Sequence, residues 1–160
     1  MLSNIVISKT AEYSLRGIVF FTKNPDAFFT IQEVAEATCA PKNYLAKILQ
    51  TLSKTGFLHS QKGLGGGFKL ACNSATTSVW DIVNAVDPIQ AITSCPLQLS
   101  EHVRLCRLHA LLNEAALRVE DTLKAVSLAE VIDGNLDGPQ RKAGQPKQST
   151  GICEFPSSKK

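Results

Sequence analysis

Long apolar runs are missing from this 160-residue sequence, and so is a recognisable export signal. No apolar stretch approaches the roughly 20 residues that cross a bilayer as a helix. The first residues, Met1 to Asn4, lack the charged and apolar regions of a signal peptide. We therefore expect a cytoplasmic protein with no membrane partner. In that compartment its 5 cysteines are expected to be reduced rather than paired in disulfides.

Two further absences limit the chemistry. The glycine-rich segment 61–70 (QKGLGGGFKL) lacks the Gly-x-x-x-x-Gly-Lys-Ser/Thr order of a mononucleotide loop, and no helix opens after it as in a dinucleotide fingerprint. No nucleophile, base and orienting group stand at a spacing that brings them together. Cys95 with His109 suggests a thiol hydrolase only by loose analogy. We expect that the protein is not an enzyme.

Charge is distributed unevenly along the chain. The composition, 44% hydrophobic and 19% charged, is that of an ordinary globular protein with one compact domain and an appendage. Residues 1–72 hold 8 Lys and Arg against 4 Asp and Glu, residues 73–133 hold 4 against 8, and residues 134–160 hold 5 against 2. The three segments therefore carry +4, −4 and +3. A local basic surface attracts nucleic acid even when the whole molecule is nearly neutral.

The glycine-rich segment lies between two short strands that we expect at 57–61 and 68–72. Glycines let a backbone approach a ligand where no Cβ would fit, and Lys62 and Lys69 add positive charge beside them. A hairpin that follows a pair of helices is a wing. The expected ligand of this wing is a polyanion.

Three helices are predicted before the wing. The first covers about residues 10–22, and the second begins at Thr30, which caps it in a capping box with Glu33. The third has Pro41 in its first turn and stops at Gly56. Its apolar positions recur at spacings of three and four: Tyr44, Leu45, Ile48, Leu49 and Leu52.

The polar face of the third helix favours a nucleic-acid contact. It carries Lys42, Asn43, Lys47 and Gln50, and no acidic residue occurs between Pro41 and Phe68. A helix-turn-helix places its second helix in the major groove, where Asn and Gln read adenine edges and Lys contacts guanine or phosphate. An isolated helix with such a face is more often simply solvated. The preceding helix and the following wing favour the nucleic-acid interpretation.

The second half of the chain predicts a short helix, a long one and a tail. Residues 76–78 cap the short helix, in which Trp80 is assigned to packing rather than to stacking on a ligand. An apolar stripe along 102–124 predicts a helix that packs on a second subunit, the alternative being a helix that folds back on its own domain. Ser127 caps a final turn, 128–132, and residues 134–160 have the composition of a disordered tail.

Three residues near the start of the long helix could bind metal. Cys95 lies in the loop 93–96, and Cys106 and His109 stand three apart on one helical face. Two thiolates and an imidazole can hold iron–sulfur or zinc. Cys39 and Cys72 are interpreted as small core hydrophobes.

Four segments in this order carry a family resemblance: 30–35 (TIQEVA), 42–49 (KNYLAKIL), 62–71 (KGLGGGFKLA) and 81–86 (DIVNAV). Over residues 7 to 133 the chain resembles the Rrf2 family of bacterial winged helix-turn-helix regulators. The resemblance implies a homodimeric DNA-binding protein, usually a repressor, whose long helices cross at the dimer interface. The expected fold is mainly α with a small β-hairpin. Its parts are a winged helix-turn-helix domain (1–88), a sensor loop with a dimerisation helix (89–133) and the tail (134–160).

The DNA-binding set comprises helix and wing positions together. It consists of Thr30, Lys42, Asn43, Tyr44, Lys47, Gln50, Lys62, Gly63, Gly65 and Gly66. Double-stranded DNA and a second copy of the chain are the expected partners.

The resemblance also implies an iron–sulfur cluster, since sensing members of the family hold one through three cysteines and a fourth ligand. That fourth ligand is a histidine beyond the last cysteine or an acidic residue from the partner's first helix. Here Cys95, Cys106, His109 and Glu12 occupy these positions, and the middle cysteine is absent. The implied cofactor is a 2Fe–2S cluster that senses redox, nitric oxide or iron status. The alternatives are a cluster-free regulator that uses thiol oxidation or a small molecule, and a winged-helix module for protein contacts.

Overall fold

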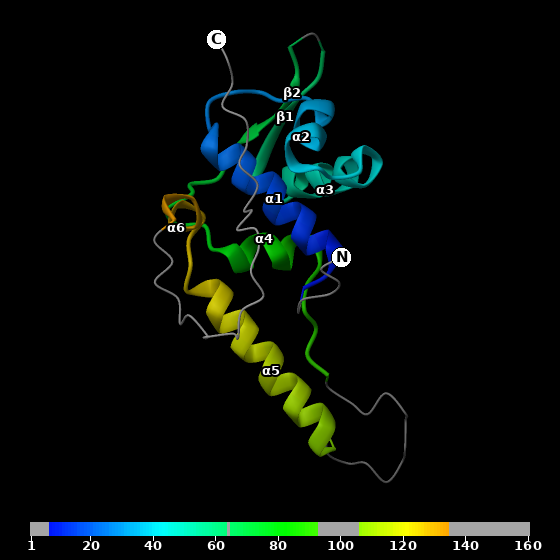
Figure 1. Cartoon of the computed structure of the whole chain (residues 1–160), viewed down its shortest axis with the longest axis vertical. Helices are drawn as coiled ribbons and strands as arrows, with labels where there is room; N and C mark the ends of the chain where they lie inside the picture. The colour runs from blue at the N-terminus through cyan, green and yellow to red at the C-terminus, as the bar shows by residue number, and fades with distance from the viewer. Residues whose placement is uncertain (1–6, 64, 93–105, 135–160) are drawn as a thin grey trace, which may run out of the picture.

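The chain is mainly helical with one antiparallel hairpin, which confirms the predicted fold class (Figure 1). The computed structural model describes residues 7–63, 65–92 and 106–134. Cys95, Leu64, residues 102–105 and the expected tail from 135 onward lie outside this description. The elements are α1 (Lys9–Lys23), α2 (Ile31–Thr38), α3 (Lys42–Lys54), β1 (Leu58–Gln61), β2 (Gly67–Leu70), α4 (Val79–Val86), α5 (Arg107–Lys124) and α6 (Leu128–Asp133).

Helix α1 packs directly on α3 and forms the centre of the core. Its N-cap is Ser8, whose hydroxyl accepts a hydrogen bond from the Ala11 amide at 3.1 Å. Gly17 faces α3 so closely that an added Cβ would lie 3.6 Å from a Leu49 methyl group. The fully buried side chains between these helices include Ile18, Phe21, Leu45, Leu49 and Leu52. Each such side chain stabilises the fold by roughly 1.5–3 kcal/mol relative to an exposed one.

The structure confirms the predicted cap of α2 and corrects two predictions about the turn between α2 and α3. The capping box is confirmed, because Glu33 accepts from the Thr30 amide at 2.7 Å and the Glu33 amide donates to the Thr30 hydroxyl at 3.3 Å. Pro41 is the N-cap of α3 rather than a residue of its first turn, because its backbone is extended (ψ 121°). Cys39 is exposed and not a core residue. It ends α2 with a left-handed backbone (φ 53°).

The wing is a two-stranded hairpin extended by a third segment. In β1 and β2, Leu58 pairs with Leu70 and Gln61 with Gly67, so the strands are shorter than the predicted 57–61 and 68–72. Phe29, just before α2, pairs with Phe68 through two backbone hydrogen bonds of 2.8 and 2.9 Å. This bridge attaches the wing to the start of α2.

Two wing glycines are required by the chain's own backbone. A Cβ on Gly67 would lie 2.4 Å from the Phe29 carbonyl oxygen, and one on Gly66 would lie 2.3 Å from the Gln61 carbonyl oxygen. Gly63 and Gly65 have φ of 101° and 75° with open space around them. The predicted role of the glycine turn in ligand approach stays a prediction, and Gly66 and Gly67 are required here by the nearby backbone of Gln61 and Phe29.

Helix α6 returns to the N-terminal core. Ser78 and Ser127, the N-caps of α4 and α6, face each other across a backbone bridge. The flanking amides of Val79 and Leu128 donate to the carbonyls of Val126 and Thr77 at 3.0 and 2.9 Å. The Leu128 side chain is fully buried in the same core cluster as α1 and α3. Residues 128–133, which the sequence grouped with the sensor loop, thus pack on the winged-helix domain.

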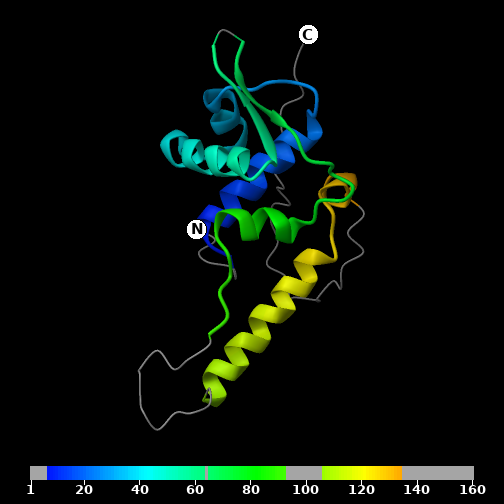
Figure 2. The same cartoon turned by 180° about the vertical axis from the view of Figure 1, so that it is seen from behind.

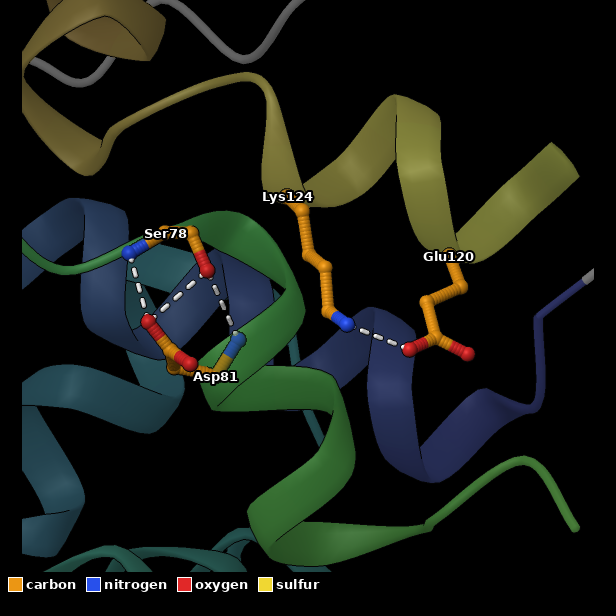
Figure 3. Close-up of polar contacts among 4 residues, drawn as sticks. All are labelled: Ser78, Asp81, Glu120 and Lys124. Carbon is orange, nitrogen blue, oxygen red and sulfur yellow. Dashed lines mark hydrogen bonds and ion pairs between the residues drawn. The ribbon is translucent and has the colours of Figure 1, made fainter. Parts of the chain in front are cut away.

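Helix α5 extends away from this body (Figures 1 and 2) and has no buried residue. At its last turn, Lys124 projects toward α4 and donates to Glu120 at 2.5 Å, close to the Ser78–Asp81 capping box (Figure 3). The Lys124 ammonium lies 5.9 Å from the centre of the Trp80 ring. Trp80 itself is buried, as its assignment to packing predicts.

Helix α5 begins at Arg107, with Cys106 as its N-cap. The sequence predicted a start at about residue 102, and residues 102–105 lie outside the described residues. Among the residues that the structure describes, no helix is both long enough and apolar enough to cross a bilayer.

Gly67→Ala is expected to lower the free energy of unfolding by about 2–3 kcal/mol, because the new Cβ meets rigid backbone at Phe29. The matched change Gly65→Ala meets no neighbouring atom and costs about 1 kcal/mol from its left-handed backbone alone. Urea unfolding followed by circular dichroism measures both. Equal losses in the two variants would contradict the tight approach of wing and α2.

Candidate nucleic-acid interface

The exposed face of α3 is formed by polar and basic side chains. Successive residues of an α-helix are rotated by about 100°, so Asn43, Lys47, Gln50 and Lys54 lie opposite the buried stripe. All four are exposed. The buried stripe consists of Leu45, Ile48, Leu49 and Leu52. Burying that stripe against α1 turns the polar face outward.

The N-terminal end of α3 favours anions. Its first turn contains no acidic residue, and Pro41 provides no side-chain hydrogen bond to the helix amides. Lys42, the first residue of the helix, is exposed at the same end. Helix N-termini carry a partial positive charge from their unpaired amides, and a neighbouring lysine adds to that field.

A groove of about 490 Å³ runs between α3, the start of α2 and the hairpin. Lys54 of α3 and Lys62 of the wing both line it, and both are exposed. Neither forms an ion pair within the part of the chain that the structure describes. Its other lining residues are Thr30, Ile31, Gln50, Ser53, Ser60, Gln61, Gly66, Gly67 and Phe68. The groove therefore has two cations available for an anionic chain.

The two lysines of the hairpin have different environments. Lys69 lies 3.8 Å from the Asp26 carboxylate and 6.0 Å from the centre of the Phe28 ring. Unlike Lys62, it does not line the groove. The sequence places both lysines beside the glycine turn. Side chains along a strand alternate between the two faces of a hairpin, and the two lysines lie on different faces. Of the two hairpin lysines, only Lys62 lines the groove.

Two predicted DNA contacts already have partners within the protein. The Thr30 hydroxyl is 2.8 Å from the Glu33 carboxylate and belongs to the capping box, although Thr30 also lines the groove. The Tyr44 hydroxyl lies 2.5 Å from the Thr10 hydroxyl. Its ring packs edge-on against Tyr13, with ring centres 5.8 Å apart.

Lys54, Ser53 and Gln61 were missing from the sequence-based set. Lys54 could have been found, because the series Asn43, Lys47, Gln50 continues to position 54 at helical spacing. Gln61 had no such signal. Its place at the groove depends on how the wing docks beside α3, which involves contacts far apart in the sequence.

The candidate metal ligands are only partly brought together. The Cys106 sulfur and Nδ1 of His109 lie 3.2 Å apart at the start of α5, and Cys95 lies outside the described residues. Glu12 sits on α1 and pairs with Arg16, which also donates to the Thr38 carbonyl at 3.4 Å. Among described residues, no three Cys, His, Asp or Glu side chains form a metal-sized group. Cys106 and His109 have the donor atoms for one iron, so the local arrangement fits half of a four-ligand set.

Cys72 has a different environment from Cys106. It is half-buried and packs against the core cluster. Burial raises the pKa of its thiol, with a hydrogen bond from Thr77 acting in the opposite direction. A protonated thiol is a weak nucleophile, so this cysteine acts as a packing residue.

Comparison with known proteins identifies related chains. A family model described as "Rrf2: Iron-dependent Transcriptional regulator" matches residues 7–134. An Aquifex aeolicus protein described as an HTH-type transcriptional regulator is 28% identical over 133 residues, which cover 81% of this chain and 92% of that protein.

Solved structures share the fold. IscR of T. potens superposes with a TM-score of 0.66 at 17% identity, covering 88% of this chain and 95% of its own. CymR, the global cysteine regulator of B. subtilis, gives a TM-score of 0.66 at 17% identity, covering 82% and 98%. The oxidised form of Staphylococcus aureus CymR gives 0.62 at 20%, covering 81% and 97%.

The capping box beside the groove predicts an acid-sensitive contribution to stability. Hydrogen bonds from the amide and then the hydroxyl of Thr30 hold the pKa of Glu33 below its usual value of 4.5. A lowered carboxyl pKa adds stability above pH 4.5, and that stability is lost as the pH falls through the pKa of the folded state. Thr30→Ala is therefore expected to move the Glu33 pKa part of the way back, whereas Thr30→Ser preserves it. Side-chain NMR titration measures the shift, and an unchanged pKa in Thr30→Ala would contradict the box.

Proposed function

The chain belongs to the Rrf2 family of transcriptional regulators, and we propose that it binds operator DNA through the outer face of α3 and the groove beside the wing. The observation that carries the proposal is the pair of lysines, Lys54 and Lys62, on opposite sides of that groove. A groove with a cation on each side suits a phosphodiester backbone, whose negative charges supply most of the affinity of such proteins.

Sequence readout is assigned to the outer face of α3. The amides of Asn43 and Gln50 suit the N6 and N7 edge of adenine, and Lys47 suits guanine or phosphate in the major groove. All three are exposed on one side of the helix. Lys42 and the helix N-terminus are assigned to phosphate. In the wing, Gly63, Gly65 and Gly66 allow the turn that presents Lys62.

A homodimer is proposed because α5 exposes its apolar side chains. The exposed fractions of Leu108, Leu111, Leu112 and Leu117 are 63%, 53%, 50% and 59%. Leu108, Leu111 and Leu112 lie on one side of α5, and an exposed apolar face on a projecting helix suits the same helix of a second copy. Two copies would present two α3 helices to a two-fold operator. Light scattering of the full chain measures the oligomeric state, and a monomer at micromolar concentration would contradict the proposal.

Regulation is proposed to use an iron–sulfur cluster held by Cys95, Cys106 and His109, with Glu12 of the partner subunit as the fourth ligand. The 3.2 Å contact between Cys106 and His109 supports this assignment. When bound, a 2Fe–2S cluster supplies a group that responds to oxidants, nitric oxide and iron supply. To take part, Glu12 has to leave Arg16, and Arg16 also contacts Thr38 beside the turn into α3. The protein would act as a repressor whose two states differ in operator affinity.

A second candidate is a cluster-free thiol sensor. Cys106 would supply the oxidisable sulfur, because it is a free, partly exposed cysteine at the start of α5, 3.2 Å from Nδ1 of His109. A regulator of this kind would bind the same DNA. Two further alternatives are a small molecule held between the domains and a winged helix used for protein contacts. Neither alternative gives the Cys106–His109 pair a role.

Neutralising the groove lysines tests the DNA interface. Lys54→Gln and Lys62→Gln are each expected to weaken duplex binding and to reduce the slope of log affinity against log salt by about 1, because each removes one phosphate contact. Fluorescence anisotropy at several salt concentrations measures the slope. Lys69→Gln is the matched control, because Lys69 faces Asp26 and Phe28 instead of the groove. Identical slopes for Lys62→Gln and Lys69→Gln would refute the assignment.

Anaerobic purification tests the cofactor. The wild-type chain is expected to absorb at roughly 400 to 450 nm and to contain inorganic sulfide in proportion to iron. Cys106→Ala and Cys95→Ala should lose both signals, while Cys72→Ala, at a cysteine packed on the core, should keep them. Iron without sulfide, or a colourless wild type, would favour the thiol sensor. Equal operator affinity of loaded and stripped protein would remove the sensing role.

A further inference from the structure

The turn between α2 and α3 is contacted on both sides by the first half of α1. Arg16 donates to the Thr38 carbonyl at the end of α2, at 3.4 Å. On the other side, Thr10 and Tyr13 contact Tyr44 in the first turn of α3, through the 2.5 Å hydroxyl pair and the edge-on ring contact. The Arg16 guanidinium in turn lies 5.7 Å from the centre of the Tyr13 ring. These α1 residues form a continuous set of contacts that we call the turn clamp: Thr10, Tyr13 and Arg16.

The start of α3 is held on two of its sides. Leu45 is fully buried against α1, whereas Pro41 provides no side-chain cap to the helix amides. Tyr44 lies on the flank of α3, between its buried stripe and its outer face, with its side chain 40% exposed. A tyrosine held at both its ring and its hydroxyl loses most of its rotational freedom, so it can hold the helix that carries it.

We propose that Tyr44 is a positioning residue for DNA recognition, which acts through its hydrogen bond to Thr10 and not by contact with a base. This inference deepens the DNA-binding function proposed above and rests on it. The Tyr44 hydroxyl is directed to α1, whereas Asn43, Lys47 and Gln50 occupy the outer face. The bond fixes the direction in which the start of α3 presents Asn43. Small errors in that direction weaken base readout more than phosphate contact, because bidentate hydrogen bonds depend strongly on angle.

A double-mutant cycle between Tyr44→Phe and Thr10→Val tests the proposal. Both changes keep the approximate size of the side chain and remove one hydroxyl each. The probe is a duplex selected from a random library by the full wild-type chain, compared with a scrambled duplex of the same length. Each single variant is expected to bind the selected duplex about 3- to 10-fold more weakly, and the double variant no more weakly than either single one. Binding to the scrambled duplex and the salt slope should stay unchanged.

Other outcomes overturn the proposal in distinct ways. If Tyr44→Phe weakens binding and Thr10→Val does not, the hydroxyl contacts DNA directly. If neither variant differs from the wild type, the hydrogen bond does not position α3. If all variants lose affinity for both duplexes in parallel with a loss of helix content, the effect is one of general stability. Circular dichroism at the binding temperature identifies that case.

Hydrogen exchange in the free protein provides a second measurement that needs no DNA. The amides of Tyr44 and Leu45 donate to the Pro41 carbonyl at 3.0 and 2.9 Å. Both amides are expected to exchange about 3- to 10-fold faster in Tyr44→Phe, in Thr10→Val and in the double variant alike. Unchanged exchange would refute the positioning role. A wild type that binds neither duplex would refute the proposed function, while this exchange result would still decide the role of Tyr44.

Discussion

The burial of one stripe of α3 against α1 is the constraint on which the other features depend. Leu45, Leu49 and Leu52 are fully buried, and Gly17 lets the two helices approach closely. Because the side chains of a helix are fixed around its axis, burying this stripe determines which residues face outward. The outer face then carries amides and lysines and no carboxylate. The same packing brings the first half of α1 to the turn before α3, where it contacts Thr38 and Tyr44.

Charge and architecture divide the molecule in the same way. The basic segment, residues 1–72, contains α1 to β2, and the acidic segment, residues 73–133, contains α4 to α6. Helix α5 projects from the winged-helix body on the side away from the hairpin (Figure 2). The backbone bridge between Ser78 and Ser127 and the buried Leu128 attach its C-terminal end to that body. Cys106 and His109 meet at the other end of this helix, at its start.

The wing illustrates why glycine has more than one role. Its sequence suggested room for a ligand, but the space beside Gly66 and Gly67 is occupied by the backbone of Gln61 and Phe29. Gly67 allows the hairpin to dock on the start of α2, beside the groove, and Gly66 allows the hairpin turn itself to close. Gly63 instead provides a left-handed turn. Local sequence predicted the turn correctly, whereas the docking partner, Phe29, lies more than thirty residues away and had no local signal.

The sequence alone determined the elements that depend on neighbouring residues. Apolar spacing, the capping box at Thr30, the caps at 76–78 and Ser127, and the glycine turn predicted the helices, the hairpin and most of the outer face of α3, because each depends on residues only a few positions apart. The tertiary structure decided which polar residues share a surface. It separated Lys62 from Lys69, brought Lys54 to the groove and joined Tyr44 to Thr10. The docking of the wing beside α3 and the contact between Tyr44 and Thr10 follow from packing between distant segments, which local periodicity does not encode.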